Sequence, residues 1–363
     1  MASQRLRDFG IEIGTLPTGP ANHLCDVPGV RVGHVTMTTA TGYRSDVCTG
    51  VTAVLPHDGN WFREPVPAVI HVINGFGKTT GTIQVNELGY LESPIMLTNT
   101  FGVGAVMQGV LQYMMQIDSA IGDGPSMNVV VGECNDSYLN DMRGLHVRPE
   151  HAVDAIQDAL AHNARTEGAI GAGTGMGCFG WKGGVGSASR QITGLSGMEH
   201  RHFTMGALVV SNFGSAKDLV INGVAVGTEF VPPKISESVP EAPIGPDGSI
   251  MIVLATDLPM SRVGLLRMAK RAVVGLARVG SYVSHGSGDV VVAFSTMRER
   301  QTSFPITEDG DLMSEIFRAT VEAVEESVLN SLAMAHTTIG KQGRVLTAFP
   351  MEAWVQGLPS SLR

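Results

Sequence analysis

Short runs of apolar residues recur along the chain and form its main pattern. Runs of this kind, bounded by turn residues and rich in Val and Ile, are typical of buried β-strands. They predict strands over residues 51–56, 67–73, 93–99, 127–133, 205–212, 250–256 and 290–295. Sheets are therefore expected to dominate the fold.

Four further segments have the apolar spacing of amphipathic helices. The clearest begins near Asp257 and Pro259 and ends at Gly280, since Pro is favoured at a helix start and Gly after its end. The expected helices cover residues 104–117, a segment that begins at Pro149, residues 257–280 and residues 312–335. Helices grouped between and after the strands, without a regular strand–helix alternation, predict a layered α+β sandwich.

The composition is that of a folded chain with a large core. Of 363 residues, 43% are hydrophobic and only 16% are charged, and so low a charge content is also typical of an oligomer subunit. The 45 glycines are about twice the usual share of roughly 7%, which predicts many tight turns or pockets lined by backbone. Residues 232–248, rich in Pro, Gly and charge, are interpreted as an exposed connector.

Charge and targeting signals narrow the class of partner. The net charge is −9 and no basic block occurs, so a nucleic-acid partner is not expected. The first residues lack the apolar core of a signal peptide, and no apolar run is long enough to span a bilayer, which predicts a cytoplasmic protein without a membrane partner. The cysteines are scattered without a C-x-x-C pair and are expected to be buried thiols: Cys25, Cys48, Cys134 and Cys178.

Three short motifs are set aside. Residues 77–79 match the end of a phosphate-binding loop, but Val72 stands where that loop needs its first glycine, so a backbone-lined turn near a pocket is favoured. Residues 175–180 match G-x-G-x-x-G but run into further glycines instead of a helix, which favours a glycine-rich loop. His200 and His202 could chelate a metal, yet no third ligand lies nearby. Neither a metal nor another cofactor is expected.

Polar residues gather at the ends of several expected strands. Residues 133–141 follow one strand, Asn212 ends another, and Ser287 and Asp289 come two residues apart before a third. Ser249 lies where the turn-rich segment PIGPDG meets the apolar run IMIVLAT. Each group alone is also typical of turns, so only their combination indicates a site.

In combination, these segments resemble the DmpA-type self-processing aminopeptidases, which include L-aminopeptidase/D-esterases and β-peptidyl aminopeptidases. The resemblance implies two β-sheets between helical layers, a four-layer αββα sandwich similar in architecture to N-terminal nucleophile hydrolases but different in connectivity. It extends over nearly the whole chain and is carried by DVPGVRVGH (26–34), PHDGN (56–60), NGFGKTTGT (74–82), GECNDSYLND (132–141), GAGTGMGCFGWKGGVGSASR (171–190), SNFG (211–214), GSIMIVLATDLP (248–259) and GSGD (286–289).

The resemblance also implies that the chain, a single domain over residues 1–363, cuts itself between Gly248 and Ser249. The products would be an α chain, 1–248, and a β chain, 249–363, assembled as a tetramer of αβ heterodimers. Ser249 would then carry both a hydroxyl nucleophile and a free α-amine, whose usual pKa of about 7.7 to 8.0 suits a base near neutrality. The activity implied is hydrolysis of short peptides, amino-acid amides or esters through an acyl-enzyme.

The remaining site residues take their roles from the same resemblance. Asn212 matches an oxyanion-hole asparagine, Tyr138 a tyrosine that helps polarise the same centre, and Glu133 an acid that meets the free amino group of the substrate. Ser287 and Asp289 match a serine and an acid that orient protons beside the nucleophile. Either this pair or the α-amine of Ser249 could serve as the base.

Substrate choice remains open at the level of sequence. Some β-aminopeptidases are expected to carry Glu where Asp289 stands, so the shorter acid favours the L-aminopeptidase/D-esterase members. Two other readings are a small-amide hydrolase similar to the pantetheine-hydrolysing relatives and a non-catalytic ligand-binding protein that keeps the scaffold without cleaving itself.

Overall fold

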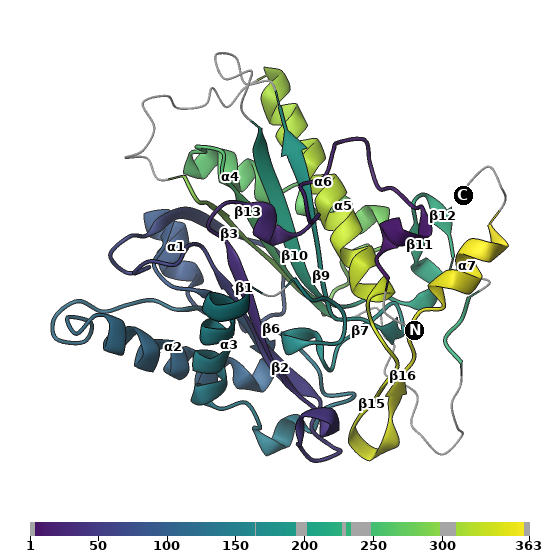
Figure 1. Ribbon diagram of the computed structural model, residues 1–363, viewed down its shortest axis with the longest axis horizontal. Coiled ribbons are helices and arrows are strands. Elements are labelled where there is room, and N and C mark those ends of the chain that lie inside the picture. Colours follow the sequence, from purple (N-terminus) through teal and green to yellow (C-terminus); the bar gives the residue numbers. More distant parts are fainter. Residues whose placement is uncertain are drawn as a thin grey trace.

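Two mixed β-sheets form the centre of the protein (Figure 1). The computed structural model describes residues 4–163, 165–193, 202–226, 230–233, 248–297 and 310–358. The smaller sheet has the strand order β1 (Arg31–Met37), β2 (Thr49–Leu55), β5 (Ile95–Asn99) and β6 (Val130–Cys134). The larger sheet has the order β4 (Tyr90–Leu91), β3 (Val66–Gly75), β14 (Gly288–Ser295), β13 (Ser249–Thr256), β10 (Phe203–Asn212) and β9 (Val185–Ile192).

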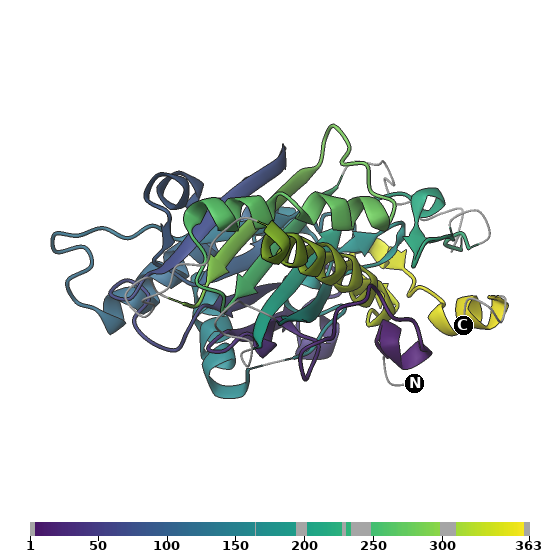
Figure 2. The same ribbon diagram turned by 90° about the horizontal axis from the view of Figure 1, so that it is seen from above.

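Helices cover the outer face of each sheet. The apolar side chains of α2 (Val103–Ile117) and α3 (Pro149–His162) pack with the four-stranded sheet in one core. Those of α4 (Arg262–Ala269), α5 (Ala272–Arg278) and α6 (Gly310–Ala333) pack with the six-stranded sheet in another. Figures 1 and 2 show these two helix groups on opposite sides of the molecule. The αββα sandwich expected from the sequence is thus confirmed.

A third core lies between the two sheets, and β13 shows how the layers are joined. Ile250 and Ile252 belong to the core under α4–α6, whereas Met251 and Val253 belong to the core between the sheets. Because side chains alternate along a strand, a strand that packs against an apolar core on both faces has apolar residues at consecutive positions. The uninterrupted run after Ser249 is the sequence signal of this central strand.

Most expected elements are present, with one helix in error. All seven predicted strands occur, as β2, β3, β5, β6, β10, β13 and β14. The single helix expected over residues 257–280 is wrong: α4 and α5 are separated by a turn at Lys270 and Arg271, and α4 begins only after Ser261, whose side chain caps Gly264 N–H. The sequence analysis did not identify β1, β9, α1 (Thr82–Leu88) and α7 (Met351–Gly357).

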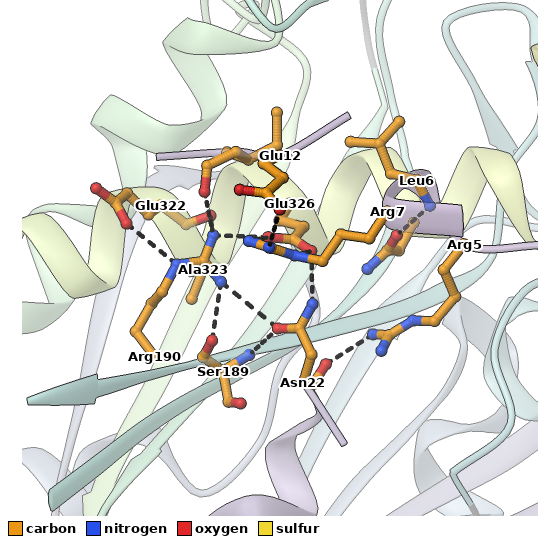
Figure 3. A network of polar contacts seen from close by, with 12 residues as sticks. Arg5, Leu6, Arg7, Glu12, Asn22, Ser189, Arg190, Glu322, Ala323 and Glu326 are labelled. Atoms are coloured by element: carbon orange, nitrogen blue, oxygen red, sulfur yellow. Dashed lines mark hydrogen bonds and ion pairs between the residues drawn. The ribbon is translucent and has the colours of Figure 1, made fainter. Parts of the chain in front are cut away.

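The sequence analysis missed β9 because several of its buried residues are polar. Arg190 has no exposed surface, and its guanidinium donates to Glu322 at 3.1 Å and to Glu326 at 2.6 Å, both on α6. Arg7 and Asn22, from the N-terminal segment, donate to the same Glu326 carboxylate, at 2.8 Å and 2.5 Å (Figure 3). This network joins β9, α6 and the N-terminal segment, and it replaces the apolar packing that a strand prediction looks for.

Three short hairpins complete the described fold, and two of them border the site. These are β7 (Gly177–Cys178) with β8 (Trp181–Lys182), β11 (Val220–Ile221) with β12 (Val224–Ala225), and β15 (Thr338–Ile339) with β16 (Val345–Leu346). All four cysteines are buried and free of disulfides, as expected. No helix in the described ranges combines the length and apolar character needed to cross a membrane. Of the expected connector, residues 234–247 lie outside the described part.

Candidate active site

Three neighbouring strands of the large sheet, β10, β13 and β14, bring candidate residues together at one end of the strands. Strand β13 runs parallel to β14 and antiparallel to β10, so β13 and β14 begin where β10 ends. In this register Asn212 pairs with Ser249, and Ser249 pairs with Gly288. Residues from three distant parts of the sequence therefore stand side by side at the first position of β13.

The Ser249 hydroxyl faces an amide donor with a fixed orientation. Asn212 Nδ2 lies 3.4 Å from Ser249 Oγ and donates to the Asn135 carbonyl at 2.9 Å. Asn212 Oδ1 accepts from Gly177 N–H at 3.0 Å, which keeps the NH₂ group directed towards the serine. Ser249 is 5% exposed. A buried hydroxyl beside an oriented N–H donor is the arrangement expected of a nucleophile with an oxyanion site.

Ser287 and Asp289 form a tight pair next to this position. Ser287 Oγ lies 2.5 Å from Asp289 Oδ2 and 2.9 Å from the Ser284 carbonyl, and both side chains of the pair are buried. Burial raises the pKa of Asp289 to about 6, although the Ser287 hydroxyl and Ile250 N–H favour the ionised carboxylate. An acid that titrates near neutrality can exchange protons during a reaction.

Glu133, near the end of β6, presents a buried carboxylate. It is 4% exposed; Oε1 accepts from Lys78 N–H at 2.9 Å, and Oε2 accepts from the Thr100 hydroxyl. These donors hold the side chain in place without neutralising its charge. A fixed carboxylate in a closed site favours a ligand ammonium group.

A cavity of about 590 Å³ connects these groups. Its size is typical of a small-molecule site. Tyr138 lines it, with the Arg344 guanidinium 5.4 Å from the ring centroid, and Leu346 on β16 lies across the same space. Of the predicted site residues, the large cavity contains Gly248, Ser249, Asn212, Glu133 and Tyr138.

Ser287 and Asp289 line a second cavity of about 10 Å³ instead. The two cavities share Phe213 and Gly214. The predicted site residues thus lie around the same strand ends of the large sheet, with Glu133 contributed by β6 of the small sheet and the Ser287–Asp289 pair facing the second cavity. The small cavity is about the size of one water molecule.

The segment at residues 74–82, set aside as a phosphate-loop look-alike, borders the site. Phe76 and Lys78 line the large cavity, which agrees with a backbone-lined turn. Asn74 Nδ2 contacts the carbonyl oxygens of Ser284, His285 and Ser287, at 3.1, 3.0 and 2.6 Å. Asn74 therefore holds the loop that carries Ser287. The sequence analysis missed Asn74, although this residue follows an apolar run just as Asn212 does.

The glycine-rich segment forms another wall of the large cavity through Gly175, Gly177 and Gly180, as its interpretation as a loop predicted. Its last part, however, is strand β9. Within the described residues, no group of three His, Cys, Asp or Glu side chains is arranged to hold a metal ion. His200 of the possible chelating pair lies outside them.

The fold and the site define a hydrolase: a two-sheet sandwich holds a buried serine, an amide donor and a Ser–Asp pair at the ends of three strands. The chain belongs to peptidase family S58, which it matches over residues 22–346. It is therefore a peptide-bond hydrolase of the serine aminopeptidase class.

Similar proteins share nearly the whole length. The chain is 39% identical to the β-peptidyl aminopeptidase BapA of Sphingosinicella microcystinivorans over 364 residues, covering 95% of this chain and 89% of that protein. It superposes on the PH0078 protein from Pyrococcus horikoshii OT3 with a TM-score of 0.85 and 44% identity, covering 97% and 98% of the two chains. It matches the L-aminopeptidase D-Ala-esterase/amidase from Ochrobactrum anthropi, described as a variant of the Ntn hydrolase fold, with a TM-score of 0.81, 33% identity and 96% coverage of each.

Proposed function

We propose that the chain cleaves itself between Gly248 and Ser249, and that Ser249 then acts as the N-terminal nucleophile of an aminopeptidase. The substrates are short peptides, amino-acid amides or esters with a free amino group. The observation that carries this proposal is the register of Asn212, Ser249 and Gly288 across three strand ends, beside the cavity that holds Glu133. The products are residues 1–248 and 249–363.

The Gly248 carbonyl supports the self-cleavage step. Its oxygen accepts from Gly288 N–H at 3.0 Å, and such a donor stabilises negative charge that develops on this oxygen. Ser249 Oγ attacks the Gly248 carbonyl carbon; the C–O bond forms, the C–N bond breaks, and the hydroxyl proton passes to the departing α-nitrogen. Water then hydrolyses the ester, which leaves a Gly248 carboxylate and a free Ser249 amine.

Substrate hydrolysis uses the same atoms. Ser249 Oγ attacks the acyl carbon, while Asn212 Nδ2 donates to the oxyanion and Tyr138 helps polarise the same centre. The Ser287–Asp289 pair or the Ser249 α-amine takes the hydroxyl proton and passes it to the amine or alcohol that leaves as its bond to the acyl carbon breaks. Water then attacks the acyl-enzyme, returns a proton to the Ser249 oxygen through the same base, and releases the acid product. Glu133 binds the substrate ammonium group, which restricts cleavage to the first residue of a peptide.

Glu133 also distinguishes an aminopeptidase from a pantetheine-type amidase. Pantetheine has no amino group, so its binding would leave the buried Glu133 carboxylate without a ligand ammonium group. Two observations differ on which kind of amino acid the enzyme removes. Asp289 favours the L-aminopeptidase/D-esterase members, whereas a 39% identical relative is named a β-peptidyl aminopeptidase. A panel of L-, D- and β-amino-acid p-nitroanilides, with pantetheine, ranks these substrates.

Assembly and location remain part of the proposal: a tetramer of cleaved heterodimers in the cytoplasm. Apolar side chains are exposed on β3 and on α1 and α4, both of which contact β3, and they offer a surface for subunit contacts: Val72, Ile83, Leu88 and Val263. Light scattering after size-exclusion chromatography measures the subunit number. A single αβ heterodimer in solution would contradict the tetramer.

The variant Ser249→Ala tests the central claim. Without the hydroxyl the chain is expected to stay uncut and inactive, and denaturing mass spectrometry reads the cleavage directly. Ser314→Ala, at an exposed serine on α6, is the matched control and should cleave normally. Splitting of Ser249→Ala at residue 248, or wild-type protein that stays intact but hydrolyses the panel, would refute the nucleophile assignment. Intact wild-type protein without activity would favour the non-catalytic reading.

A further inference from the structure

Lys182, on β8, is a fully buried lysine beneath the glycine-rich wall of the cavity. It has no exposed surface, and its ammonium group donates to three backbone carbonyls: Gly173 at 2.9 Å, Met176 at 2.8 Å and Gly183 at 2.6 Å. An ammonium has three N–H donors and no acceptor, so three carbonyls satisfy it completely. Burial of this kind occurs only where the charge is well partnered.

The protonated form of Lys182 is the one that fits this cage. Burial lowers the pKa of Lys182 to about 7, while electrostatic attraction to Cys48, Cys178 and Asp136 raises it. A neutral amine would turn its lone pair towards one of the carbonyl oxygens, and that contact is repulsive. The three short donor–acceptor distances therefore indicate a charged group that holds the loop together.

The loop it holds has few side chains to define its shape. Residues 173–177 read Gly-Thr-Gly-Met-Gly, and glycine allows many backbone conformations. Only Thr174 and Met176 have side chains to pack, both of them buried, so the conformation of the glycines depends on hydrogen bonds of the backbone. Lys182 supplies the charged donor for two carbonyls of this loop, those of Gly173 and Met176.

One peptide group links Lys182 to the catalytic centre. The Met176 carbonyl accepts from Lys182 Nζ, and the N–H of the same peptide group, that of Gly177, donates to Asn212 Oδ1 at 3.0 Å. The peptide group is planar, so fixing its carbonyl also fixes the direction of its N–H. The positive charge at the carbonyl polarises the peptide as well, which makes the N–H a stronger donor.

We propose that Lys182 is a positioning residue that orients the Asn212 amide towards Ser249 through the Met176–Gly177 peptide. The contact between Asn212 Oδ1 and Gly177 N–H directs Nδ2 towards the oxyanion. Lys182 supplies the charged donor that keeps this N–H in place, beside the Gly183 N–H, which donates to the same Met176 carbonyl at 3.0 Å. The inference rests on the proposed function, since it assigns Asn212 as the oxyanion donor. It adds a residue that touches neither the substrate nor the nucleophile.

A double-mutant cycle tests the inference. Lys182→Met removes the donors at similar volume, and kcat and KM are measured on one L-amino-acid p-nitroanilide, normalised to the cleaved fraction by mass spectrometry. We expect kcat to fall about 10- to 100-fold with little change in KM, since small misplacements at a reacting centre can cost on the order of 10²-fold. In an Asn212→Ala background the same change should cost less than about threefold, because the oriented group is already gone.

Two further variants keep the result decisive. Lys182→Gln retains two N–H donors without the charge; it should give an intermediate kcat and serves where the Met variant does not fold. Lys217→Met, at an exposed lysine, is the control and should match the wild type. An equal loss of kcat with and without Asn212, a change confined to KM, or no change would overturn the role of Lys182. Full activity in Ser249→Ala or Asn212→Ala would instead refute the proposed function itself.

Discussion

The cleavage site can be tested at Gly248, where the structure leaves no room for a side chain. A Cβ atom built on Gly248 would lie 2.2 Å from the Asn212 carbonyl oxygen and 2.7 Å from Phe213 Cα. Both are backbone atoms of β10 and its continuation, so neither can swing aside. Ordinary contacts begin near 3.4 Å, and 3.4 − 2.2 = 1.2 Å is therefore the displacement that Gly248→Ala requires.

Such a displacement falls on the reacting carbonyl itself. The Gly248 oxygen is held by Gly288 N–H at 3.0 Å, and a shift of about 1 Å would break this hydrogen bond and misalign the carbon with Ser249 Oγ. Misplacement by about 1 Å at a reacting centre costs on the order of 10² in rate. We expect the first-order rate of self-cleavage of Gly248→Ala to fall by about that factor.

The assay is a time course of denaturing mass spectrometry on freshly purified protein. Gly104→Ala is the matched control, since a Cβ there meets no atom within 4 Å and the residue lies in α2. Once cut, Gly248→Ala should hydrolyse substrate at the wild-type rate, because residue 248 is then a chain end and no longer bonded to Ser249. Cleavage as fast as the wild type would refute the view that the tight fit at Gly248 aligns the bond.

Two further predictions concern the Ser287–Asp289 pair and the polar network around Glu326. Burial raises the pKa of Asp289 to about 6 from its usual value near 3.9. If the ionised Asp289 receives the proton, kcat/KM should fall as the pH is lowered, with a midpoint near pH 6, so that the activity at pH 5 is about a tenth of the plateau. A midpoint near 7.7 to 8.0 would assign the base to the Ser249 amine and contradict this. Glu326→Ala should lower the free energy of unfolding by about 3–5 kcal/mol, because it removes the buried carboxylate that Arg190, Arg7 and Asn22 share and leaves Arg190 with Glu322 alone as its acidic partner. Urea unfolding measures the loss, with exposed Glu352→Ala as control. A loss within about 0.5 kcal/mol would refute the importance of the network.

The sequence predicted the layers of the fold because apolar runs identify strands buried on both faces. It predicted less well wherever polar groups take the place of apolar ones. Strand β9 buries Ser187, Ser189 and Arg190, which bond to residues far away in the chain, and no local pattern contains that information. The division of the expected 257–280 helix at Lys270 and Arg271 likewise had no Pro or Gly to mark it.

The candidate site residues were visible or hidden in the sequence for a related reason. Asn212, Ser287 and Asp289 are polar residues beside apolar strands, and this contrast is visible in one dimension. Lys182 instead lies among glycines, and only the folded chain shows its three carbonyl partners. Asn74 is also a polar residue beside an apolar strand. Its contact, however, is with a loop more than two hundred residues away in the chain, and only the pairing of β3 with β14 reveals it.

The strand order explains why a cut at Gly248 need not separate the two products. In the large sheet, β13 and β14 follow residue 248 in the chain, yet they lie between β3 and β10, which precede it. Separation of residues 249–363 from 1–248 would break both pairings and expose the cores on either side of β13. The same order requires the sheet to form first, because Ser249 meets Asn212 and Gly288 only when β10, β13 and β14 are paired. Self-cleavage should therefore report completed folding: destabilised variants that fail to pair these strands should stay uncut even though Ser249 is intact.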